Sequence, residues 1–551
     1  MHRIFVIFLL ICAHPLTPSH HARELPDPAP LGAVSSAHPL ATQAGVAILE
    51  SGGNAFDAAI AVAATLNVVE PMMSGMGGYG TILIYDAASG RVRYLDSSGK
   101  IPVHMNSDLM RPPTPDWEAN RTGAKSISTP GNVNAWDAMS RTYGRLPWAQ
   151  LFEHAIEVAD NGFVVSERTA MMINYSWDAM PAHARTFYGR NGSALQAGDT
   201  LVQKDLASSL ALLAREGRSV FYEGTLAQKI VKAMKDHDSF LGAEDLAQDR
   251  AEWWDPISID YRDHVVYTAS PPANAFPALI RLGLMERLND GLEHNSTDYL
   301  HCFAEATKHA FWCRLKYAGD PEIKPPPLGT LLSSAYLDEV TKGIDLKSAS
   351  EFVPPGLSGS SGDHTTHFVV ADRWGNIVSA TQTLGNLFGS KIMPEGTGIW
   401  FNNSLAYCTY EPKGNPMDAI PGQRKLSGDC PVILFRDGRP VYALGTPGGH
   451  TIPQTVPQMI INIIDYDMSI SDALAAPRIS FIEPDQIAIE DGIPASVIRQ
   501  LKQRGHRERT TRALGNAHGL QLMYDAQGKV RGYLGSADPR GEGSWMIAQD
   551  K

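Results

Sequence analysis

The sequence predicts an α+β fold in which β-sheets are buried beneath layers of helices. Strand-like segments lie towards both ends of the 551-residue chain, and the stretch between them, from about residue 134 to 346, has mainly helical periodicity. A Gly/Ser-rich segment, PPGLSGSSGD at 354–363, separates this stretch from the strands that follow. Because strands and helices are segregated along the chain, we expect sheets packed against layers of helices.

The elements before the helical stretch carry clear start and stop signals. Residues 41–50 form a helix that ends at Ser51-Gly52-Gly53, and Asn54 caps a second helix over 55–68, which is rich in small residues. The loop EPMMSGMGGYG follows this helix. The segments TILIYD and RVRYLD after the loop predict a hairpin.

After the Gly/Ser-rich segment the pattern returns to strands. Four runs predict strands, namely THFVVA, IVSATQT, PVILFRDG and PVYALG. A long helix, TIPQTVPQMIINIID, and a short one at DALAAP come next, and a hairpin around DAQGKV closes the series.

Composition and charge limit the class of protein. Hydrophobic residues make up 43% and charged residues 19% of the chain, which is typical of a soluble globular protein. The net charge of −12 argues against nucleic acid and anionic membranes as partners, because both bind basic surfaces. Residues 1–22 have a signal-peptide pattern, with an apolar run too short to span a bilayer. We therefore expect an exported protein, periplasmic or secreted.

Four cysteines follow the signal segment, too few for a disulfide scaffold in a chain of this length. Cys302 and Cys313 fall in one predicted helix and lie roughly 16 Å apart along it, too far to form a bond. Cys408 and Cys430 bracket a loop rich in proline and glycine, and the sequence allows either a disulfide that closes this loop or two unpaired thiols. No Cys/His spacing predicts a metal site.

A glycine motif in the N-terminal loop imitates a dinucleotide-binding site. Gly75, Gly77 and Gly80 satisfy G-x-G-x-x-G, but such a site needs a strand before the loop and a helix after it. Here a helix precedes the loop and a strand follows it. We therefore expect a closely packed turn and no nicotinamide or flavin cofactor.

The strands on either side of Asp372 predict a hairpin that brings two threonines together. Asp372 and Asn376 flank a three-residue loop that ends in glycine, as in the hairpin class with a type I turn and a left-handed residue. In this register Thr365 opposes Thr383. The β-carbons of opposed residues lie about 5 Å apart, so the two hydroxyl groups are expected to interact. Opposed threonines are also an ordinary structural feature of sheets.

Thr365 has a second property, because it directly follows the Gly/Ser-rich segment. If the peptide bond between His364 and Thr365 is cut, a new α-amino group with an ordinary pKa near 8 can accept the proton of the Thr365 hydroxyl. The tetrahedral intermediate formed by this nucleophile needs backbone N–H donors. The loop GTPGG, which ends in Gly448 and Gly449, follows a predicted strand and can supply them. The pattern is consistent with a threonine nucleophile activated by its own N-terminal amine, while a plain turn is the structural alternative for the glycines.

Several segments, in this order, resemble the γ-glutamyltransferase (glutathione hydrolase) family over nearly the whole chain after the signal. Thr365-Thr366-His367 matches the TTH motif of that family, whose first threonine becomes the new N-terminus. The other matching segments are HPLATQAGVAILESGGNAFDAA, EPMMSGMGG, AEATKHAFWCRLKYAGDP, GTPGG and SADPR.

The resemblance implies an N-terminal-nucleophile hydrolase with a four-layer αββα sandwich. It implies self-cleavage into a large subunit, 23–364, and a small subunit, 365–551, which remain one folded unit. In the family, the residue matching Thr383 hydrogen-bonds the nucleophile, and Gly448 and Gly449 match the oxyanion glycines. The expected partner is a small-molecule amide or peptide, glutathione-like or another acyl amide, with no cofactor and no metal.

The residues that hold the glutamate head group in the family are largely replaced here. Ser98 stands at the position of the family's arginine. Lys100, two residues on, is a candidate to reach the same substrate carboxylate in its place, although a lysine cannot reproduce the bidentate fork of an arginine. The remaining candidate substrate-binding residues are Asn403, Ser404, Ser427 and Gly428. The three positions that hold the α-amino group in the family are Gly385, Ser404 and Tyr407, and none of them is acidic.

These replacements bear on the acyl group that the enzyme cleaves. Charge-assisted hydrogen bonds contribute roughly 1.5–3 kcal/mol each, so losing several weakens the binding of a γ-glutamyl head by orders of magnitude. The sequence therefore favours amide hydrolysis either of γ-glutamyl compounds or of another acyl group, such as glutaryl or oxamate. A non-catalytic exported binding protein on the same fold is the alternative from a different class.

Overall fold

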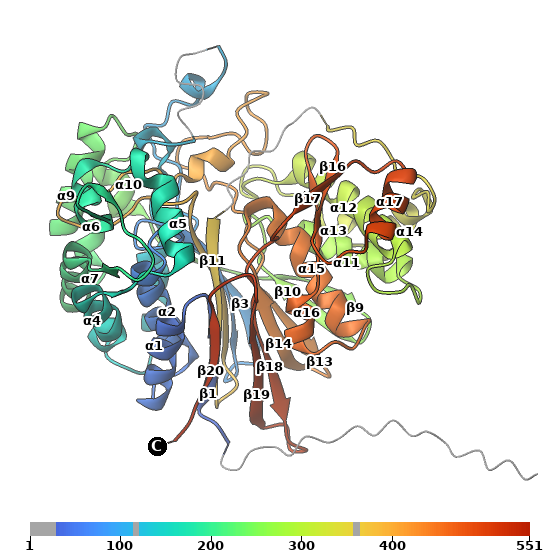
Figure 1. The fold of residues 1–551 in the computed structure, drawn as a ribbon, viewed down its shortest axis with the longest axis horizontal. Coiled ribbons are helices and arrows are strands. Elements are labelled where there is room, and N and C mark those ends of the chain that lie inside the picture. The colour runs from blue at the N-terminus through green and yellow to red at the C-terminus, as the bar shows by residue number, and fades with distance from the viewer. Residues whose placement is uncertain (1–28, 114–120, 356–363, 551) are drawn as a thin grey trace, which may run out of the picture.

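The computed structural model describes residues 29–113, 121–355 and 364–550, and in it two antiparallel β-sheets pack face to face between two layers of helices (Figure 1). The first sheet has seven strands. In spatial order they are β20 (Ser544–Ala548), β1 (Gly32–Ser36), β11 (His364–Asp372), β12 (Ile377–Gly385), β2 (Tyr79–Asp86), β3 (Arg91–Asp96) and β8 (Glu252–Trp254).

The second sheet has six strands, all antiparallel to their neighbours. In spatial order they are β19 (Val530–Ala537), β18 (His518–Tyr524), β14 (Arg439–Gly445), β13 (Val432–Arg436), β10 (His264–Thr268) and β9 (Ile257–Tyr261). A smaller three-stranded sheet consists of β15 (Ile479–Ile482), β16 (Gln486–Glu490) and β17 (Glu508–Thr511).

The helices form the two outer layers of the sandwich, one on each side of the paired sheets (Figure 1). The helices on the side of the first sheet include α1 (Pro39–Glu50), α2 (Ala55–Val69), α3 (Asn132–Tyr143), α4 (Glu153–Asn161), α5 (Glu167–Ser176), α6 (Ala182–Tyr188), α7 (Lys204–Glu216), α9 (Thr225–Asp236) and α10 (Ala243–Gln248). Those on the side of the second include α11 (Phe276–Leu288), α12 (Thr297–Tyr317), α14 (Ser334–Lys342), α15 (Ile452–Ile464), α16 (Ile470–Ala475) and α17 (Ala495–Gln503).

Along each central strand, successive side chains point alternately to the helical layer and to the other sheet. In β11, Val370 belongs to the core shared with α1 and α2, whereas Val369 belongs to the core between the two sheets. The same division separates Ile82 from Leu83 in β2. Successive strand residues point to opposite faces, so both faces of the sheet are covered. The αββα sandwich that the resemblance implied is thereby confirmed.

The predicted helix signals act as expected at the start of the chain. The Asn54 side chain accepts hydrogen bonds from the backbone N–H groups of Phe56 and Asp57, and the Asp57 carboxylate accepts one from the backbone N–H of Asn54, which completes a capping box. The helix before it, α1, ends at Ser51 as predicted.

The stretch predicted to be mainly helical also contains strands that were missed, and three of them, β8, β9 and β10, belong to the two large sheets. Two of them, β9 and β10, form the edge of the second sheet, and β10 pairs with β13. Their sequence, ISIDYRDHVVYT, alternates with period two around a tight turn, so the signal was present but was outweighed by the helices on either side.

The other predictions about the N-terminal loop and the cysteines can also be compared with the structure. The loop of Gly75, Gly77 and Gly80 follows α2 and precedes β2, and a Cβ at Gly77 would lie 2.2 Å from the carbonyl oxygen of Trp400, so the loop is a closely packed turn. Cys408 and Cys430 are both buried free thiols, as are the other two described cysteines.

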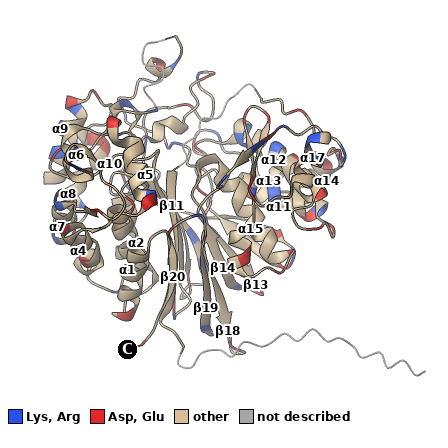
Figure 2. Cartoon of the chain, in the orientation of Figure 1, with Lys and Arg blue, Asp and Glu red and all other residues tan. Residues whose placement is uncertain are grey.

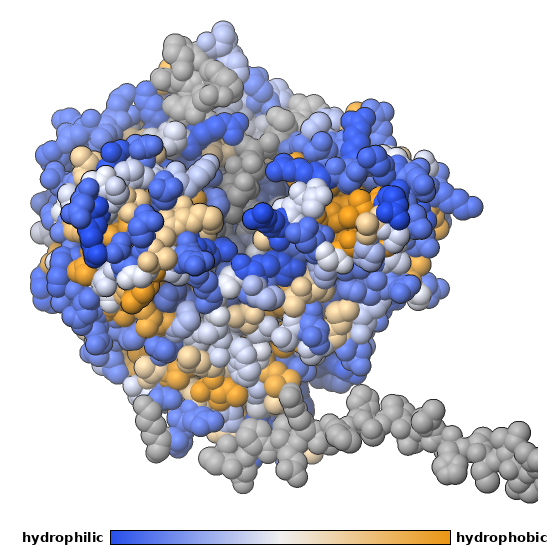
Figure 3. All heavy atoms as spheres, in the orientation of Figure 1, coloured by the Kyte–Doolittle hydropathy of each residue, from blue (hydrophilic) through white to orange (hydrophobic). Residues whose placement is uncertain are grey.

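Most charged residues lie in the helical layers and loops, and few lie on the central strands (Figure 2). On the face shown in Figure 3, hydrophilic residues predominate and the hydrophobic patches are small and separate. Within the described ranges no helix is long and apolar enough to cross a membrane. The predicted signal segment, residues 1–22, lies outside these ranges.

Asp372 joins the β11–β12 turn to the first helical layer. Its buried carboxylate accepts hydrogen bonds from the backbone of Ala55, Trp374 and Asn376, and from the side chain of Asn376. The carboxylate therefore fixes the turn and meets the N-terminus of α2 at the same time, where the helix dipole favours negative charge.

Replacing Asp372 should consequently destabilise the fold. We expect Asp372→Ala to lower the free energy of unfolding by about 3 kcal/mol, because several buried donors lose their acceptor. The matched control is Asp525→Ala, since Asp525 accepts from Gln527 and Lys529 in the solvent-facing β18–β19 turn. Its effect should stay below about 1 kcal/mol. Urea unfolding measures both values, and equal losses would contradict the bridging role of Asp372.

Candidate active site

The β11–β12 hairpin has the register that its turn predicts. Asp372 N donates to the carbonyl oxygen of Asn376 at 3.1 Å, and Gly375 adopts a φ of +90°, in the left-handed region. Val370 lies opposite Val378, and the pairing continues in step as far as Thr366 opposite Gln382. The three-residue turn therefore sets which residues face one another along the whole hairpin.

The pairing shifts by one residue at the end of the hairpin, so that His364 pairs with Gly385. The predicted threonine contact is nevertheless present. Thr365 Oγ1 donates to Thr383 Oγ1 at 3.2 Å, and Thr383 Oγ1 donates to the carbonyl oxygen of His364 at 2.8 Å. The backbone N–H of Gly385 donates to Thr383 Oγ1 at 2.8 Å. A short chain of hydroxyl groups therefore leads from Thr365 to the carbonyl group of the preceding residue.

The two residues after Thr365 anchor β11 on both faces of the sheet. Thr366 Oγ1 donates to Glu70 Oε2 at 2.8 Å on the helical side, and His367 Nδ1 lies 2.9 Å from Thr381 Oγ1 between the sheets. Burial raises the pKa of Glu70, although its contact with Thr366 acts in the opposite direction. With both neighbours fixed, Thr365 has little freedom to move out of register.

A glycine lets the second sheet approach the first close to Thr365. A Cβ on Gly445, the last residue of β14, would lie 2.4 Å from the imidazole of His367. Only glycine fits this contact without a shift of the ring. The loop that follows Gly445 therefore begins beside β11, two residues from Thr365.

The GTPGG loop has a conformation that requires its glycines. Gly448 has a φ of +134° and Gly449 a φ of +56°, values that side chains with a Cβ rarely adopt. Thr451 Oγ1 donates to the carbonyl oxygen of Gly448 at 2.8 Å, just before α15 begins. Thr446 Oγ1 accepts from the backbone N–H of Asn516 at 3.0 Å, which connects the loop to the segment just before β18.

A buried ion pair holds the segment behind this loop. Arg478 and Asp538 lie 2.8 Å apart, and both are almost fully buried. Arg478 also donates to the carbonyl oxygen of Leu514, and Asp538 accepts from the backbone of Ala517. Burial acts to raise the pKa of Asp538, but Arg478 and Arg540 outweigh it and the pKa is lowered. The ionised pair therefore holds both ends of the segment 514–517, which in turn contacts the GTPGG loop through Thr446.

A cavity of about 630 Å³ opens beside the junction of His364 and Thr365. His364 and Gly448 line it, together with the residues Phe311, His450, Thr451, Ser480, Phe481, Ile482, Glu483, Ala488, Arg509, Thr511, Ala513, Leu514 and Gly515. Burial lowers the pKa of His364 to about 4, helped by nearby Lys391 and Arg168, so this imidazole is neutral at pH 7. The cavity has polar, charged and aromatic walls, and it brings together the residue before Thr365 and one glycine of the GTPGG loop.

Two of the predicted substrate-binding residues lie beside the GTPGG loop. A Cβ on Gly428 would lie 3.0 Å from the carbonyl oxygen of Gly449. Ser427 Oγ lies 3.1 Å from Thr81 Oγ1, on the face of the sheet that carries Thr383. Both residues therefore line the same end of the sandwich as the threonine pair.

The other predicted binding residues have mainly internal partners. Asn403 accepts from the backbone of Asn386 at 2.8 Å and donates to the carbonyl oxygen of Arg121, and the Ser404 hydroxyl donates to Ser128. Lys100 is half-exposed, and its Nζ lies 4.0 Å from Glu252. The suggestion that Lys100 replaces the family's arginine therefore has no support from the geometry, because a carboxylate of the protein already faces the ammonium group.

Ser98, at the position of the family's arginine, belongs to a network of side chains that bind one another. Ser98 Oγ donates to Asp96 at 3.0 Å, and Asp96 also forms an ion pair with Arg424. The other arm of the Arg424 guanidinium contacts Glu252. Since two carboxylates of the protein already bind the Arg424 guanidinium, Arg424 is not available for bidentate binding of a substrate carboxylate.

Sequence reasoning missed the charged residues on either side of Ser427. Lys425 is buried, its Nζ lies 3.2 Å from the centroid of the Tyr79 ring, and it makes no hydrogen bond among the described residues. Asp429 is buried too and accepts from Thr81 Oγ1 at 3.0 Å. Burial lowers the pKa of Lys425 and raises that of Asp429. Three charged residues within a short apolar segment, RKLSGDCPVILF, were the available signal.

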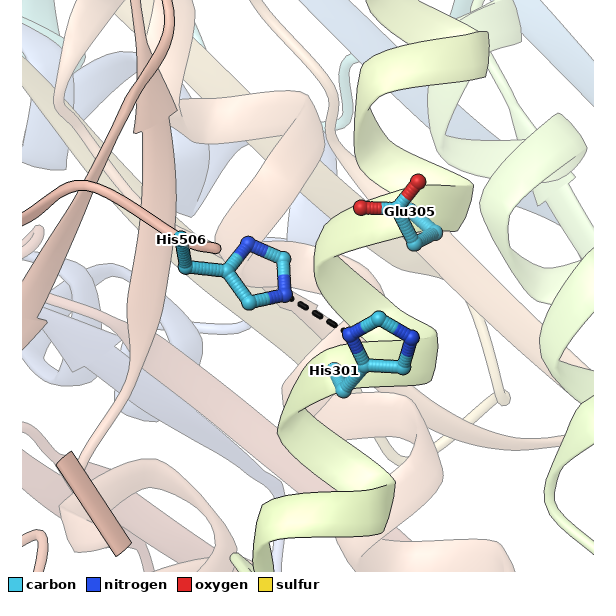
Figure 4. A group of neighbouring side chains, drawn as sticks. All are labelled: His301, Glu305 and His506. Carbon is cyan, nitrogen blue, oxygen red and sulfur yellow. Dashed lines mark hydrogen bonds between the residues drawn. The ribbon is translucent and has the colours of Figure 1, made fainter. Parts of the chain in front are cut away.

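One group of described residues resembles a metal site. Donor atoms of His301, Glu305 and His506 lie within 4.8 Å of one another, with His301 and Glu305 one turn apart on α12 (Figure 4). His301 Nε2 must donate to the carbonyl oxygen of Asp345, so its Nδ1 accepts from His506 Nε2 at 2.8 Å. Glu305 accepts from the Lys308 ammonium at 3.0 Å. These donors already have partners, and the Lys308 charge opposes a cation.

The cluster instead fixes the segment that leads towards Thr365. Asp345 is bound through its carbonyl oxygen to His301, and Ser350 contacts both Glu305 and Lys308. Residues 345–350 are thereby attached to α12. A cavity of about 680 Å³ adjoins this segment and contains none of the predicted site residues.

The chain is similar to known proteins over nearly its whole length. The family model described as Gamma-glutamyltranspeptidase matches residues 41–548. The chain is 32% identical over 529 residues to the "Glutathione hydrolase proenzyme" of Escherichia coli strain K12, covering 92% of this chain and 90% of that protein. It is 35% identical over 508 residues to the "Acylase ACY 1 proenzyme" of Pseudomonas sp. strain V22, covering 90% of each.

A solved structure of an acylase has the same architecture over the whole chain. The cephalosporin acylase from Bacillus halodurans superimposes with a TM-score of 0.85 at 28% sequence identity, covering 98% of this chain and 99% of that one. The match of the family model to most of the chain, together with these relatives, shows that the protein belongs to the γ-glutamyltranspeptidase family and is an amide hydrolase of the N-terminal-nucleophile type.

Proposed function

We propose that the chain cleaves itself between His364 and Thr365 and then uses Thr365 as the nucleophile that hydrolyses an acyl amide. The observation that carries this proposal is the run of hydrogen bonds from Thr365 Oγ1 through Thr383 Oγ1 to the carbonyl oxygen of His364. It supports the self-cleavage step, because it joins the attacking hydroxyl to the carbonyl group that it would attack, and it places Thr383 beside the same hydroxyl for the second step.

In the first step Thr365 Oγ attacks the carbonyl carbon of His364. The Thr383 hydroxyl donates to the carbonyl oxygen as negative charge develops there, and it accepts the hydrogen bond of the Thr365 hydroxyl. The C–N bond between the two residues breaks, the nitrogen takes up a proton, and an ester joins His364 to Thr365 Oγ. Water then cleaves the ester, which leaves a carboxylate on His364 and a free amine on Thr365.

In the second step the freed amine acts as the base for its own hydroxyl. Thr365 Oγ attacks the amide carbonyl of the substrate, and the backbone N–H groups of Gly448 and Gly449 would stabilise the oxyanion. The proton held by the amine passes to the leaving nitrogen, so an acyl ester remains on Thr365. Water releases the acid and restores the free hydroxyl. The cavity beside His364 offers room for the amide substrate.

The acyl group is proposed to lack the α-ammonium of glutamate. No acidic side chain replaces the family's partner for that ammonium, since the three matching positions are Gly385, Ser404 and Tyr407. The nearby guanidinium of Arg424 is neutralised by Asp96 and Glu252. Relatives named as acylases are as similar to this chain as those named glutathione hydrolases, so both activities occur at this level of similarity.

Self-cleavage can be tested on variants of the threonine pair. Wild-type protein should convert from its 59.8 kDa precursor to two fragments, the smaller beginning at Thr365. Thr365→Ala should remain intact, and Thr383→Ala should cleave on the order of 100-fold more slowly, since one donor to the oxyanion is lost. Gel time courses and N-terminal sequencing give the readout.

Thr383→Ser is the matched control, because it keeps the hydroxyl and should restore most of the rate. An intact precursor in the wild type, with no smaller fragment, would instead favour the non-catalytic binding protein. Equal rates for Thr383→Ala and the wild type would remove Thr383 from the mechanism.

Acyl preference can be tested with two substrates that differ only in one amine. The processed enzyme should hydrolyse glutaryl-p-nitroanilide with a kcat/KM at least about tenfold above that for γ-glutamyl-p-nitroanilide, because each missing charge-assisted contact costs roughly 1.5–3 kcal/mol. An oxamate amide completes the comparison. Faster turnover of the γ-glutamyl substrate would refute the altered preference and leave glutathione hydrolysis as the activity.

A further inference from the structure

Lys425 is the one described lysine whose ammonium group is fully enclosed and makes no hydrogen bond. It carries three N–H donors and no acceptor, and its contact is the face of the Tyr79 ring at 3.2 Å. A buried charge without a hydrogen-bonding counter-ion is strongly disfavoured unless another function retains it. A hydrogen-bond acceptor on a bound molecule would satisfy the N–H donors of Lys425.

Tyr79 places this ammonium group next to the proposed catalytic pair. In the sheet, Tyr79 of β2 lies directly opposite Thr383 of β12, so the two side chains share one face and are cross-strand neighbours. That face also carries the hydroxyl of Thr365. Lys425 therefore lies over the cross-strand neighbour of Thr383, on the face of the sheet that carries the proposed nucleophile.

The acidic residue nearby does not neutralise Lys425 directly. Asp429 favours the charged form of Lys425 through its own charge, but it makes no hydrogen bond with the ammonium and accepts from the hydroxyl of Thr81. Thr81 donates its hydroxyl proton to Asp429. Ser427, 3.1 Å from Thr81 Oγ1, donates its own proton within the same Thr81–Asp429 cluster. Ser427 therefore presents acceptors to a ligand, and Lys425 is the donor that remains for an anion.

We propose that Lys425 binds the distal carboxylate of the acyl group, so that the enzyme cleaves amides of dicarboxylic acids that lack an α-amino group. This inference rests on the proposed function and names the substrate class of the same site. The ammonium of Lys425 attracts the carboxylate of a glutaryl-type chain and repels the ammonium of a γ-glutamyl chain. Lys425 thereby takes over charge recognition from the arginine that the chain lacks.

The test compares three p-nitroanilides on the processed wild type, on Lys425→Met and on Lys425→Arg. Glutaryl and pentanoyl substrates have five carbons each and differ in the distal carboxylate, and the γ-glutamyl substrate adds the amine. Wild type should favour glutaryl over pentanoyl by about tenfold or more, mainly through a lower KM, as expected for a charge-assisted contact. Lys425→Met should bring this ratio to about 1, and Lys425→Arg should restore part of it.

Lys413→Met is the matched control, since Lys413 lies in the same loop but is exposed and paired with Asp108. It should keep the wild-type ratio. Succinyl and adipoyl substrates then report which chain length reaches Lys425.

Each outcome separates the two proposals. Preference of the wild type for the γ-glutamyl substrate would overturn the proposed acyl class and this inference together. A wild type that favours glutaryl substrates, with a Lys425→Met variant that keeps that preference, would overturn the role of Lys425 alone. If Lys425→Met does not process, inhibition of the wild type decides, because glutarate should inhibit more strongly than pentanoate, and equal inhibition would refute the inference.

Discussion

The hydrogen bond from the Thr383 hydroxyl to the carbonyl oxygen of His364 is the interaction on which the rest of this site depends. It exists only because β11 and β12 pair in one register up to the last residues of the hairpin. A slip of one residue would turn Thr383 towards the helical layer and remove its hydroxyl from the carbonyl group. The anchors of Thr366 on Glu70 and of His367 on Thr381 oppose such a slip from both faces.

The two sheets contribute different parts of the site. The first provides the threonine pair, and the second provides the GTPGG loop, which meets it where Gly445 allows β14 to pack against His367. The ion pair of Arg478 with Asp538 fixes the segment beneath that loop. Because Thr365 and the GTPGG loop belong to different sheets, the relative position of the proposed nucleophile and the proposed oxyanion donors depends on how the two sheets pack.

Charge is distributed unevenly around this end of the sandwich. Arg424 is fully neutralised by Asp96 and Glu252, whereas Lys425, the next residue, is enclosed without a hydrogen-bonding partner. A stable core would normally pair or replace such a lysine. This contrast is the reason for assigning a structural role to Arg424 and proposing ligand recognition for Lys425.

The sequence by itself determined the local features, because turn and cap chemistry acts over a few residues. The three-residue loop ending in Gly375 was sufficient to predict the hairpin register, and Asn54 was sufficient to predict the start of α2. Family resemblance supplied the αββα order. Tertiary structure alone decided that β9 and β10 extend the second sheet, that Lys100 faces Glu252, and that Lys425 lies over Tyr79 beside Thr383. These contacts join segments far apart in the chain, and their geometry comes from how the two sheets pack, which no local pattern records.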